Sequence, residues 1–293
     1  MNEYTIITDT ACDISPALLK KWGVEYINLT YRFDDEDIDY TSDKTDIKRF
    51  YNKMREGGVA KTAAINPDTF ENEFEKCLKK GYDILYLGFS SGLSTTYNSS
   101  QIAANELAER YPNQKIITVD TLCASAGQGL FVYLVAEEKK KGATIEQAAE
   151  YANKLVPNLC HWFTVDDLVY LKRGGRISPT TAFVGTVLNI KPVLHVDNEG
   201  KLINMTKARG RKMSMRTLAE KFGEFANDKK NGTIFISHAD CENDAKMLAQ
   251  TIKKATAPQL MLLPTSVPLL AHIPVPVRWH FSLWVKKDKA QKG

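Results

Sequence analysis

The sequence predicts an α/β protein of two domains, an N-terminal domain with a parallel sheet and a C-terminal mixed α/β domain. The first observation is length, because 293 residues correspond to about two domains at roughly 100–200 residues each. The second is an alternation of short apolar segments, polar turns and amphipathic segments, which is typical of β-α-β units. The third is a change in this pattern near Leu155. We therefore expect domains at 1–157 and 158–293, with an atypical tail at 263–293.

The predicted strands are short segments rich in β-branched or apolar residues. Residues 83–89 are apolar on both faces, which fits an interior strand of a parallel sheet. Residues 197–200 end in glycine between two apolar segments, and this pattern indicates a hairpin. In chain order, strands are predicted at 4–8, 24–29, 83–89, 115–119, 160–165, 192–196, 201–203 and 233–237.

The predicted helices begin at capping residues and end at glycine or near the next strand. Asp13 and Ser15 are suitable N-caps for the first helix, and Pro16 lies in its first turn. Gly57 ends a second helix and Pro67 begins a third. Helices are predicted at 16–22, 46–56, 67–80, 97–110, 124–141, 144–155, 213–227 and 241–256, whereas 34–46 and 61–67 are expected to be loops.

Composition excludes several classes of protein. With 43% hydrophobic and 25% charged residues the chain is ordinary globular protein, and a net charge of +4 is too small to indicate nucleic-acid binding. No apolar run approaches the roughly 20 residues that span a bilayer, so no stable membrane insertion is expected. The first four residues do not resemble a signal peptide. The five cysteines are widely spaced, which indicates free thiols in the cytoplasm and no metal site.

The segment 90–96, Ser-Ser-Gly-Leu-Ser-Thr-Thr, is the richest candidate for a binding site. It places hydroxyls and backbone N–H groups between a predicted strand and a predicted helix. Ligands of parallel sheets bind at the carboxyl ends of the strands, and helix N-termini attract anions. A carboxylate or a phosphate is therefore the expected ligand, and the alternative is an ordinary helix cap with a polar turn.

Residues 88–92 also match the G-x-S-x-G nucleophile elbow, with Ser90 as the nucleophile of a serine hydrolase. Such a site needs a histidine base and an acid from later in the chain. Five histidines follow, and none lies in a context that marks it as the base: His161, His195, His238, His272 and His280.

Two shorter features have several interpretations. Asp9 and Thr10 follow the first strand as in an aspartyl phosphotransferase, but a Mg²⁺ site usually needs a second carboxylate close by and position 11 is Ala11. A polar crevice wall is the favoured interpretation. Residues 172–176, Lys-Arg-Gly-Gly-Arg, form a cationic turn whose arginines can pair with carboxylates or phosphates. It is either a partner-docking patch or a solvated turn, and charge alone favours the solvated turn.

Together these segments resemble the DegV family over about residues 4–262. Several motifs in the expected order are more specific than any one glycine loop. The matching segments are 8–10, Thr62 in its loop, 90–99, 119–121, 170–178, 191–194 and 236–240.

The resemblance implies a lipid-binding protein in which a long-chain fatty acid such as palmitate lies in an apolar tunnel between the domains. Its carboxylate would be held by the hydroxyls of Thr62 and Ser94, with Ser91 and Thr95 as possible supporting residues. A buried carboxylate must be hydrogen-bonded or neutralised, which hydroxyls and helix N–H groups can do. Burial of a sixteen-carbon chain supplies about 10 kcal/mol or more of gross driving force.

The resemblance also implies a partner, because some members carry the acyl chain for a separate fatty acid kinase catalytic subunit. Arg173 would face that partner. No residue of this chain would then act as acid, base or nucleophile, and no cofactor or metal is expected. The serine hydrolase at Ser90 is the alternative, and a sensor of small anions is a third interpretation.

The tail departs from the family pattern, which ends in a sequence like Gly-Pro-Val-Ile-Gly-Ala-His-Ser-Gly-Pro-Gly. Glycine does not occur in 264–292, whereas prolines do. Codons permitted by 266–285 spell the family sequence when they are read one base earlier. We hypothesise that the tail from about Leu263 arises from a reading-frame shift, which sequencing of codons 258–268 tests. The implied histidine would fall at position 273, and the neighbouring His272 is a candidate contact to the carboxylate.

Overall fold

The computed structural model of the chain describes residues 3–166, 168, 171–172, 174–177, 189–226, 232–255, 259–263 and 283–286. Arg173, His272 and residues 264–282 lie outside these ranges. The roles of Arg173 and His272 and the origin of the tail therefore stay predictions.

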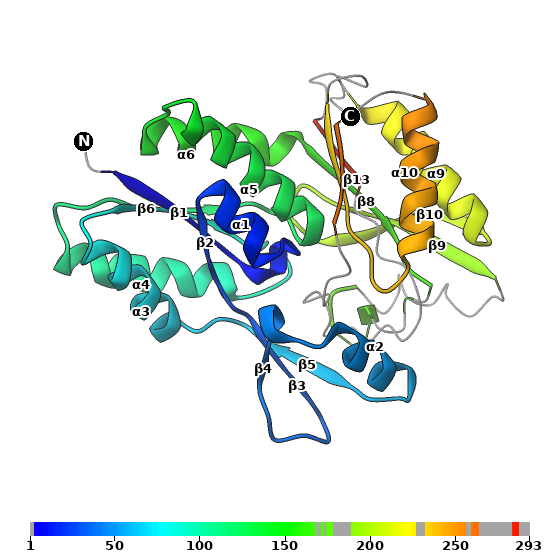
Figure 1. Ribbon diagram of the computed structural model, residues 1–293, viewed down its shortest axis with the longest axis horizontal. Helices are drawn as coiled ribbons and strands as arrows, with labels where there is room; N and C mark the ends of the chain where they lie inside the picture. Colours follow the sequence, from blue (N-terminus) through cyan, green and yellow to red (C-terminus); the bar gives the residue numbers. More distant parts are fainter. Residues whose placement is uncertain are drawn as a thin grey trace.

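A four-stranded parallel sheet forms the centre of the N-terminal half (Figure 1). The strand order is β2-β1-β6-β7. β6 is buried at every position, as expected for the doubly apolar segment 83–89. The strands are β1 (Tyr4–Asp9), β2 (Val24–Ile27), β6 (Asp83–Gly88) and β7 (Ile116–Asp120).

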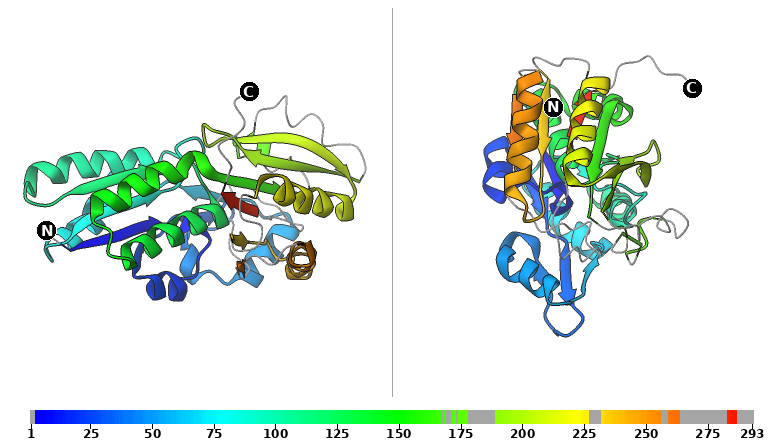
Figure 2. Two further views of the ribbon diagram at one scale, coloured as in Figure 1. Left: turned by 90° about the horizontal axis from the view of Figure 1, so that it is seen from above. Right: turned by 90° about the vertical axis from the view of Figure 1, so that its right-hand side faces the viewer.

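Helices cover both faces of this sheet, with α1, α5 and α6 on one side and α3 and α4 on the other (Figures 1 and 2). Asn66 caps α3, since its side chain accepts a hydrogen bond from Thr69 N, and Pro67 occupies the first helical position, as predicted. Thr144 begins α6 with a capping box. The helices are α1 (Pro16–Trp22), α3 (Pro67–Leu78), α4 (Thr96–Arg110), α5 (Ser125–Lys140) and α6 (Ile145–Leu155).

A small antiparallel sheet projects from the N-terminal half and carries α2 (Ile47–Arg55) (Figure 1). Its order is β4-β3-β5, with β3 (Thr30–Phe33), β4 (Tyr40–Thr41) and β5 (Ala60–Ala63). The prediction that 34–46 and 61–67 are only loops is therefore wrong in part. β4 is two residues long and only Ala60 of β5 is buried, so neither strand shows an apolar pattern.

The C-terminal half combines a mixed set of strands with two helices. An antiparallel sheet has the order β10-β9-β8-β13, and a separate two-stranded parallel sheet pairs β11 with β12. The predicted hairpin at 197–200 is confirmed, whereas β12 was not predicted. The elements are β8 (Leu159–Thr164), β9 (Ile190–Val196), β10 (Leu202–Arg209), α9 (Arg211–Phe225), β11 (Thr233–Ile236), α10 (Glu242–Ala255), β12 (Gln259–Leu262) and β13 (Leu283–Lys286).

One hydrophobic core cluster contains residues from both halves of the chain. Phe89 and Leu93 from the first half belong to the same buried cluster as Phe163, Ile177 and Leu194 from the second. A short 3-10 helix at Val156–Asn158 leads from α6 into β8, close to the predicted boundary between residues 157 and 158. The division into two domains at that point stays a prediction.

The buried imidazole of His161 predicts an acid-sensitive fold. His161 Nε2 lies 3.4 Å from Cys123 Sγ, and burial lowers the pKa of His161 well below its ordinary value. Below about pH 6.5 the unfolded chain binds a proton at this position that the folded chain does not. The free energy of unfolding should therefore fall on acidification by up to about 1.4 kcal/mol per pH unit from this group, until the lowered pKa is reached.

Urea unfolding of the wild type and of His161→Gln between pH 7.5 and pH 5 measures this contribution. The expected result is a shallower loss of stability in the variant, since His238, whose pKa burial also lowers, remains in both proteins. Identical pH slopes in the two proteins would contradict the assignment.

Candidate functional site

A cavity of about 420 Å³ lies at the carboxyl edge of the parallel sheet, where β6 leads into α4. Its lining from the first half comes from three parts of the chain: Leu29 after β2, the strand β5 with the residue after it, and the segment 89–95. Arg176 from the C-terminal half completes the lining. The lining residues are Leu29, Thr62, Ala63, Ala64, Phe89, Ser91, Leu93, Ser94, Thr95 and Arg176.

Four of the predicted site residues therefore line one cavity: Thr62, Ser91, Ser94 and Thr95. Thr62 comes from β5, where it pairs with Tyr31 across the small sheet. The other three come from the segment before α4, as the anion-site hypothesis expects. The structure thus brings into proximity hydroxyls that are about thirty residues apart in sequence.

The Ser94 hydroxyl is held by a short chain of hydrogen bonds. Ser94 Oγ accepts from Thr96 N at 3.2 Å and lies 2.9 Å from Thr96 Oγ1. Thr96 Oγ1 in turn accepts from Ile65 N at 3.3 Å, which ties the segment to the residues after β5. When Thr96 donates to Ser94, the proton of Ser94 is left to donate to an anion in the cavity.

The start of α4 adds a favourable field for an anion. Thr95 is the N-cap residue and is exposed, and the helix runs from there for four turns to Arg110. The first N–H groups of a helix have no partner within it and carry partial positive charge. Ser91 N donates to Asp120 Oδ1 at 3.2 Å, which orients the loop toward the strand ends. A negatively charged group is therefore the ligand that this corner favours.

Arg176 is the cavity residue that sequence reasoning missed. The sequence predicts a partner surface or a solvated turn here, whereas Arg176 Nε donates to Leu93 O at 3.2 Å and Nη1 donates to Gly174 O. Burial lowers the pKa of the guanidinium, which nevertheless stays charged at neutral pH. Gly175, with φ of +71°, makes the tight turn that returns Arg176 toward the cavity. The pair Gly174-Gly175 is the sequence feature that indicates a tight turn at this position.

Asp9 lies behind the cavity wall, where its carboxylate accepts hydrogen bonds from backbone N–H groups. Its carboxylate accepts hydrogen bonds from Ala11 N at 3.0 Å, Phe89 N at 2.9 Å and the Tyr86 hydroxyl at 2.7 Å. Burial raises the pKa of Asp9, although these donors act in the opposite direction. This favours the crevice-wall interpretation over a phosphotransferase. Within the described ranges no group of three or more metal-ligating side chains occurs.

Ser90 has a structural position that does not suit a nucleophile. It is 0% exposed, its hydroxyl donates to Gly200 O at 2.9 Å, and its oxygen accepts from Gly92 N at 3.2 Å. The hairpin turn of the second half therefore lies directly on Ser90. His195 Nδ1 forms a hydrogen bond with His161 O, and His238 Nδ1 accepts one from Cys241 N. In both histidines, Nδ1 therefore has a partner other than Ser90.

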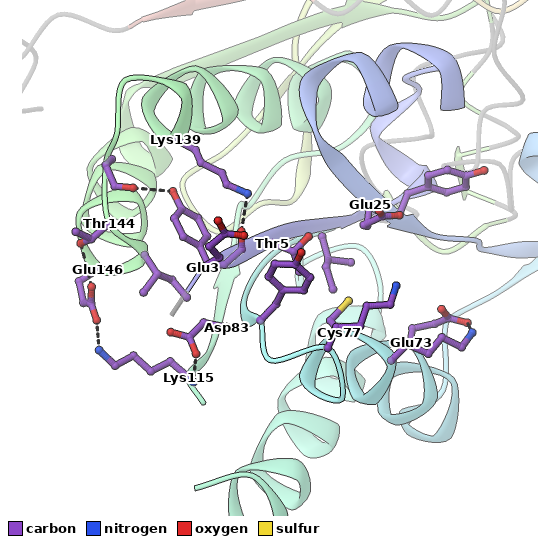
Figure 3. A pocket seen from close by; sticks show the side chains of 18 of the residues that line it. Glu3, Thr5, Glu25, Glu73, Cys77, Asp83, Lys115, Lys139, Thr144 and Glu146 are labelled. Atoms are coloured by element: carbon purple, nitrogen blue, oxygen red, sulfur yellow. Dashed lines mark hydrogen bonds and ion pairs between the residues drawn. The ribbon is translucent and has the colours of Figure 1, made fainter. Parts of the chain in front are cut away.

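A larger hollow, of about 1120 Å³, lies at the opposite edge of the sheet, beside the amino ends of β1 and β6 (Figure 3). Charged side chains there already have partners. Lys115 forms an ion pair with Glu146, and Lys139 Nζ donates to Tyr4 O at 2.5 Å while it lies 4.7 Å from the centre of the Tyr4 ring. Burial raises the pKa of Tyr4 to about 12. These charged groups at the hollow are thus engaged within the protein.

Comparisons with known proteins find similarity over most of the chain. A family model described as "Uncharacterised protein, DegV family" matches residues 3–273. A DegV domain-containing protein from Clostridium perfringens is 44% identical over 255 residues, which are 87% of this chain and 88% of that protein.

Solved structures are similar over nearly the whole chain. A Thermotoga maritima protein whose structure reveals a fatty acid binding function is 27% identical with a TM-score of 0.83, covering 97% of this chain and 100% of that one. The Streptococcus pneumoniae Fatty Acid Kinase (Fak) B3 protein, loaded with linoleic acid, is 23% identical with a TM-score of 0.82, covering 98% and 100%. At that identity the second likeness concerns the fold alone. In the described part of the chain, no helix has the length and apolar character of a membrane span.

Proposed function

Because this chain belongs to the DegV family, we propose that it binds a long-chain fatty acid such as palmitate and presents its carboxylate to a separate kinase. The main observation behind this proposal is that Thr62 and Ser94 line the same cavity, beside the N-terminus of α4. The fatty acid binding function of the Thermotoga maritima relative supports the ligand class.

The carboxylate is proposed to lie between the hydroxyls of Thr62 and Ser94. Hydrogen bonds to a charged acceptor are shorter and stronger than neutral ones, so two hydroxyls can compensate for much of the lost hydration. The guanidinium of Arg176, which lines the same cavity, adds positive charge that the neutral donors do not have. Ser91 and Thr95 are exposed and mark the side of the cavity that faces solvent.

The acyl chain is proposed to run from this cavity between the two halves of the protein. Leu29, Phe89 and Leu93 line the cavity and belong to the buried cluster that Phe163 and Leu194 enter from the second half. A volume of about 420 Å³ lies within the range of roughly 300–1,000 Å³ that small-molecule sites occupy. Each buried CH₂ contributes about 0.8 kcal/mol, so the chain supplies most of the affinity and the head-group contacts supply its orientation.

The proposal assigns no acid, base or nucleophile to this chain. Phosphorylation of the carboxylate would be done by a separate kinase, which would reach the head group from the side of Ser91 and Thr95. The family resemblance motivates this partner, because some members carry the acyl chain for a separate kinase subunit. The Streptococcus pneumoniae Fatty Acid Kinase (Fak) B3 protein shares the fold. Arg173, which adjoins the described turn 174–177, is proposed to contact the kinase. The buried, hydrogen-bonded hydroxyl of Ser90 argues against the serine hydrolase.

Denaturing extraction of the purified protein followed by mass spectrometry tests the ligand. The expected result is about one long-chain fatty acid per chain, with the same lipid rebinding after its removal. A phosphorylated metabolite in its place would favour the small-anion sensor. Incubation of the loaded protein with a fatty acid kinase subunit and ATP tests the second half of the proposal, which predicts an acyl phosphate that Arg173→Ala reduces without loss of bound lipid.

A further inference from the structure

Thr62 is carried on a small projecting unit that we call the arm, residues 30–63 (Figure 1). In the arm, α2 packs on β3 through aromatic side chains, and Ala60 of β5 belongs to the same buried cluster. The Phe50 ring centre lies 5.1 Å from that of Tyr31 and 5.6 Å from that of Phe33, and all three side chains are buried. Tyr31 is the residue paired with Thr62 across the sheet. Thr62 is therefore paired with a strand residue that contacts α2 directly.

A loop of the second half, Ser237–Asp240, bridges the arm and the body of the first half, and we call it the strut. At its first residue, Ser237 Oγ lies 3.0 Å from Ser125 Oγ, and both residues are buried. Ser125 is the first residue of α5 and donates its own proton to the Asp13 carboxylate. Ser237 is therefore the donor to Ser125, and this end of the strut is fixed to the body.

The other end of the strut contacts the arm. Ala239 is buried and belongs to the same hydrophobic cluster as the aromatic side chains of the arm. Asp240 forms an ion pair with Arg55, the last residue of α2, and the two side chains are 40% and 38% exposed. Asp240 has φ of +53°, in the left-handed region that is unfavourable for residues other than glycine, asparagine and aspartate. The surrounding contacts hold the carboxylate toward α2.

We propose that the strut is a positioning device for the head-group site: the Arg55–Asp240 ion pair and Ala239 fix the arm, and the arm fixes the Thr62 hydroxyl. A hydrogen bond weakens steeply when its geometry is disturbed, so a looser arm releases the carboxylate faster. Arg55 and Asp240 do not line the cavity and act through Thr62. The effect on ligand release rests on the proposed function, whereas the effect on the arm does not.

The test compares variants of the ion pair in the full-length, lipid-loaded protein. Asp240→Asn removes the charge and keeps a residue that tolerates positive φ. Transfer of bound palmitate to excess albumin should become about two- to five-fold faster, as expected for the loss of a partly exposed ion pair. Arg55→Gln should have the same effect and Arg55→Lys should restore slow release. Arg32→Gln is the matched control, because Arg32 pairs with Asp39 within the arm, and it should leave release unchanged.

Two further measurements identify the route of the effect. In a Thr62→Ala background, Asp240→Asn should add nothing to the release rate, and an undiminished effect there would overturn the role of Thr62. Hydrogen–deuterium exchange of the β5 amides should accelerate in Asp240→Asn relative to Arg32→Gln whether or not lipid is bound. Unchanged exchange would overturn the strut, whereas a wild-type protein that retains no fatty acid would contradict the proposed function alone.

Discussion

The double variant Thr62→Ala/Ser94→Ala is expected to bind palmitate about 100- to 10,000-fold more weakly than the wild type. A hydrogen bond to a charged group contributes about 1.5–3 kcal/mol, and the variant removes one from each side of the cavity. Each single substitution should then weaken binding by about 10- to 100-fold. Titration of the delipidated proteins with a fluorescent fatty acid, displaced by palmitate, measures these differences.

The matched control is Thr62→Ser/Ser94→Thr, which keeps both hydroxyls and should keep most of the affinity. Ser94 also accepts from Thr96 N, so the melting temperature of each variant should be recorded beside its affinity. Retention of stoichiometric fatty acid by the alanine double variant would show that the carboxylate is held elsewhere.

Substitution of Gly92 is expected to destabilise the fold strongly. A Cβ at this position would lie 2.5 Å from Glu199 O and 2.9 Å from the Gly200 carbonyl atoms, all of them backbone. Gly92→Ala must therefore push the hairpin turn away from the loop that carries Ser94. Overpacking of this kind costs about 1–3 kcal/mol and occasionally more, and urea unfolding of the two proteins measures it.

Gly223→Ala is the control for this substitution. Gly223 lies within α9, and a Cβ there would meet nothing within 4 Å. Alanine is the better helix former by about 0.5–1 kcal/mol, so this variant should be as stable as the wild type or more stable. A Gly92→Ala protein that unfolds at the same urea concentration as the wild type would mean that the hairpin does not press on the loop.

The elements that the sequence predicted well are those whose signals are local. The interior strand at 83–89 has apolar residues on both faces, and Pro16 and Pro67 mark helix starts that the structure reproduces. The strands of the arm could not be predicted in this way, because β5 pairs with a distant strand and has one buried residue. β12 has no fully buried residue at all, and its place depends on pairing with β11.

The same contrast between local signals and distant contacts applies to the residues of the candidate site. The segment 90–96 could be predicted to favour an anion, since a strand end, hydroxyls and a helix start follow one another along the chain. Thr62 was indicated only by the family resemblance, because nothing in its local sequence connects it to Ser94. Arg176 could not be assigned to the cavity, since charge patterning does not show that a turn of the second half reaches Leu93 O.

The contact between the hairpin turn and Ser90 has a consequence for biosynthesis. A ribosome makes Thr62 and Ser94 early, but the carbonyl of Gly200 that receives the Ser90 hydroxyl emerges more than a hundred residues later. Arg176 is also added after the whole parallel sheet has been made. In a nascent chain that ends before the hairpin, Ser90 therefore lacks its acceptor and Arg176 is missing from the cavity lining, so we expect the proposed lipid binding only in the finished polypeptide.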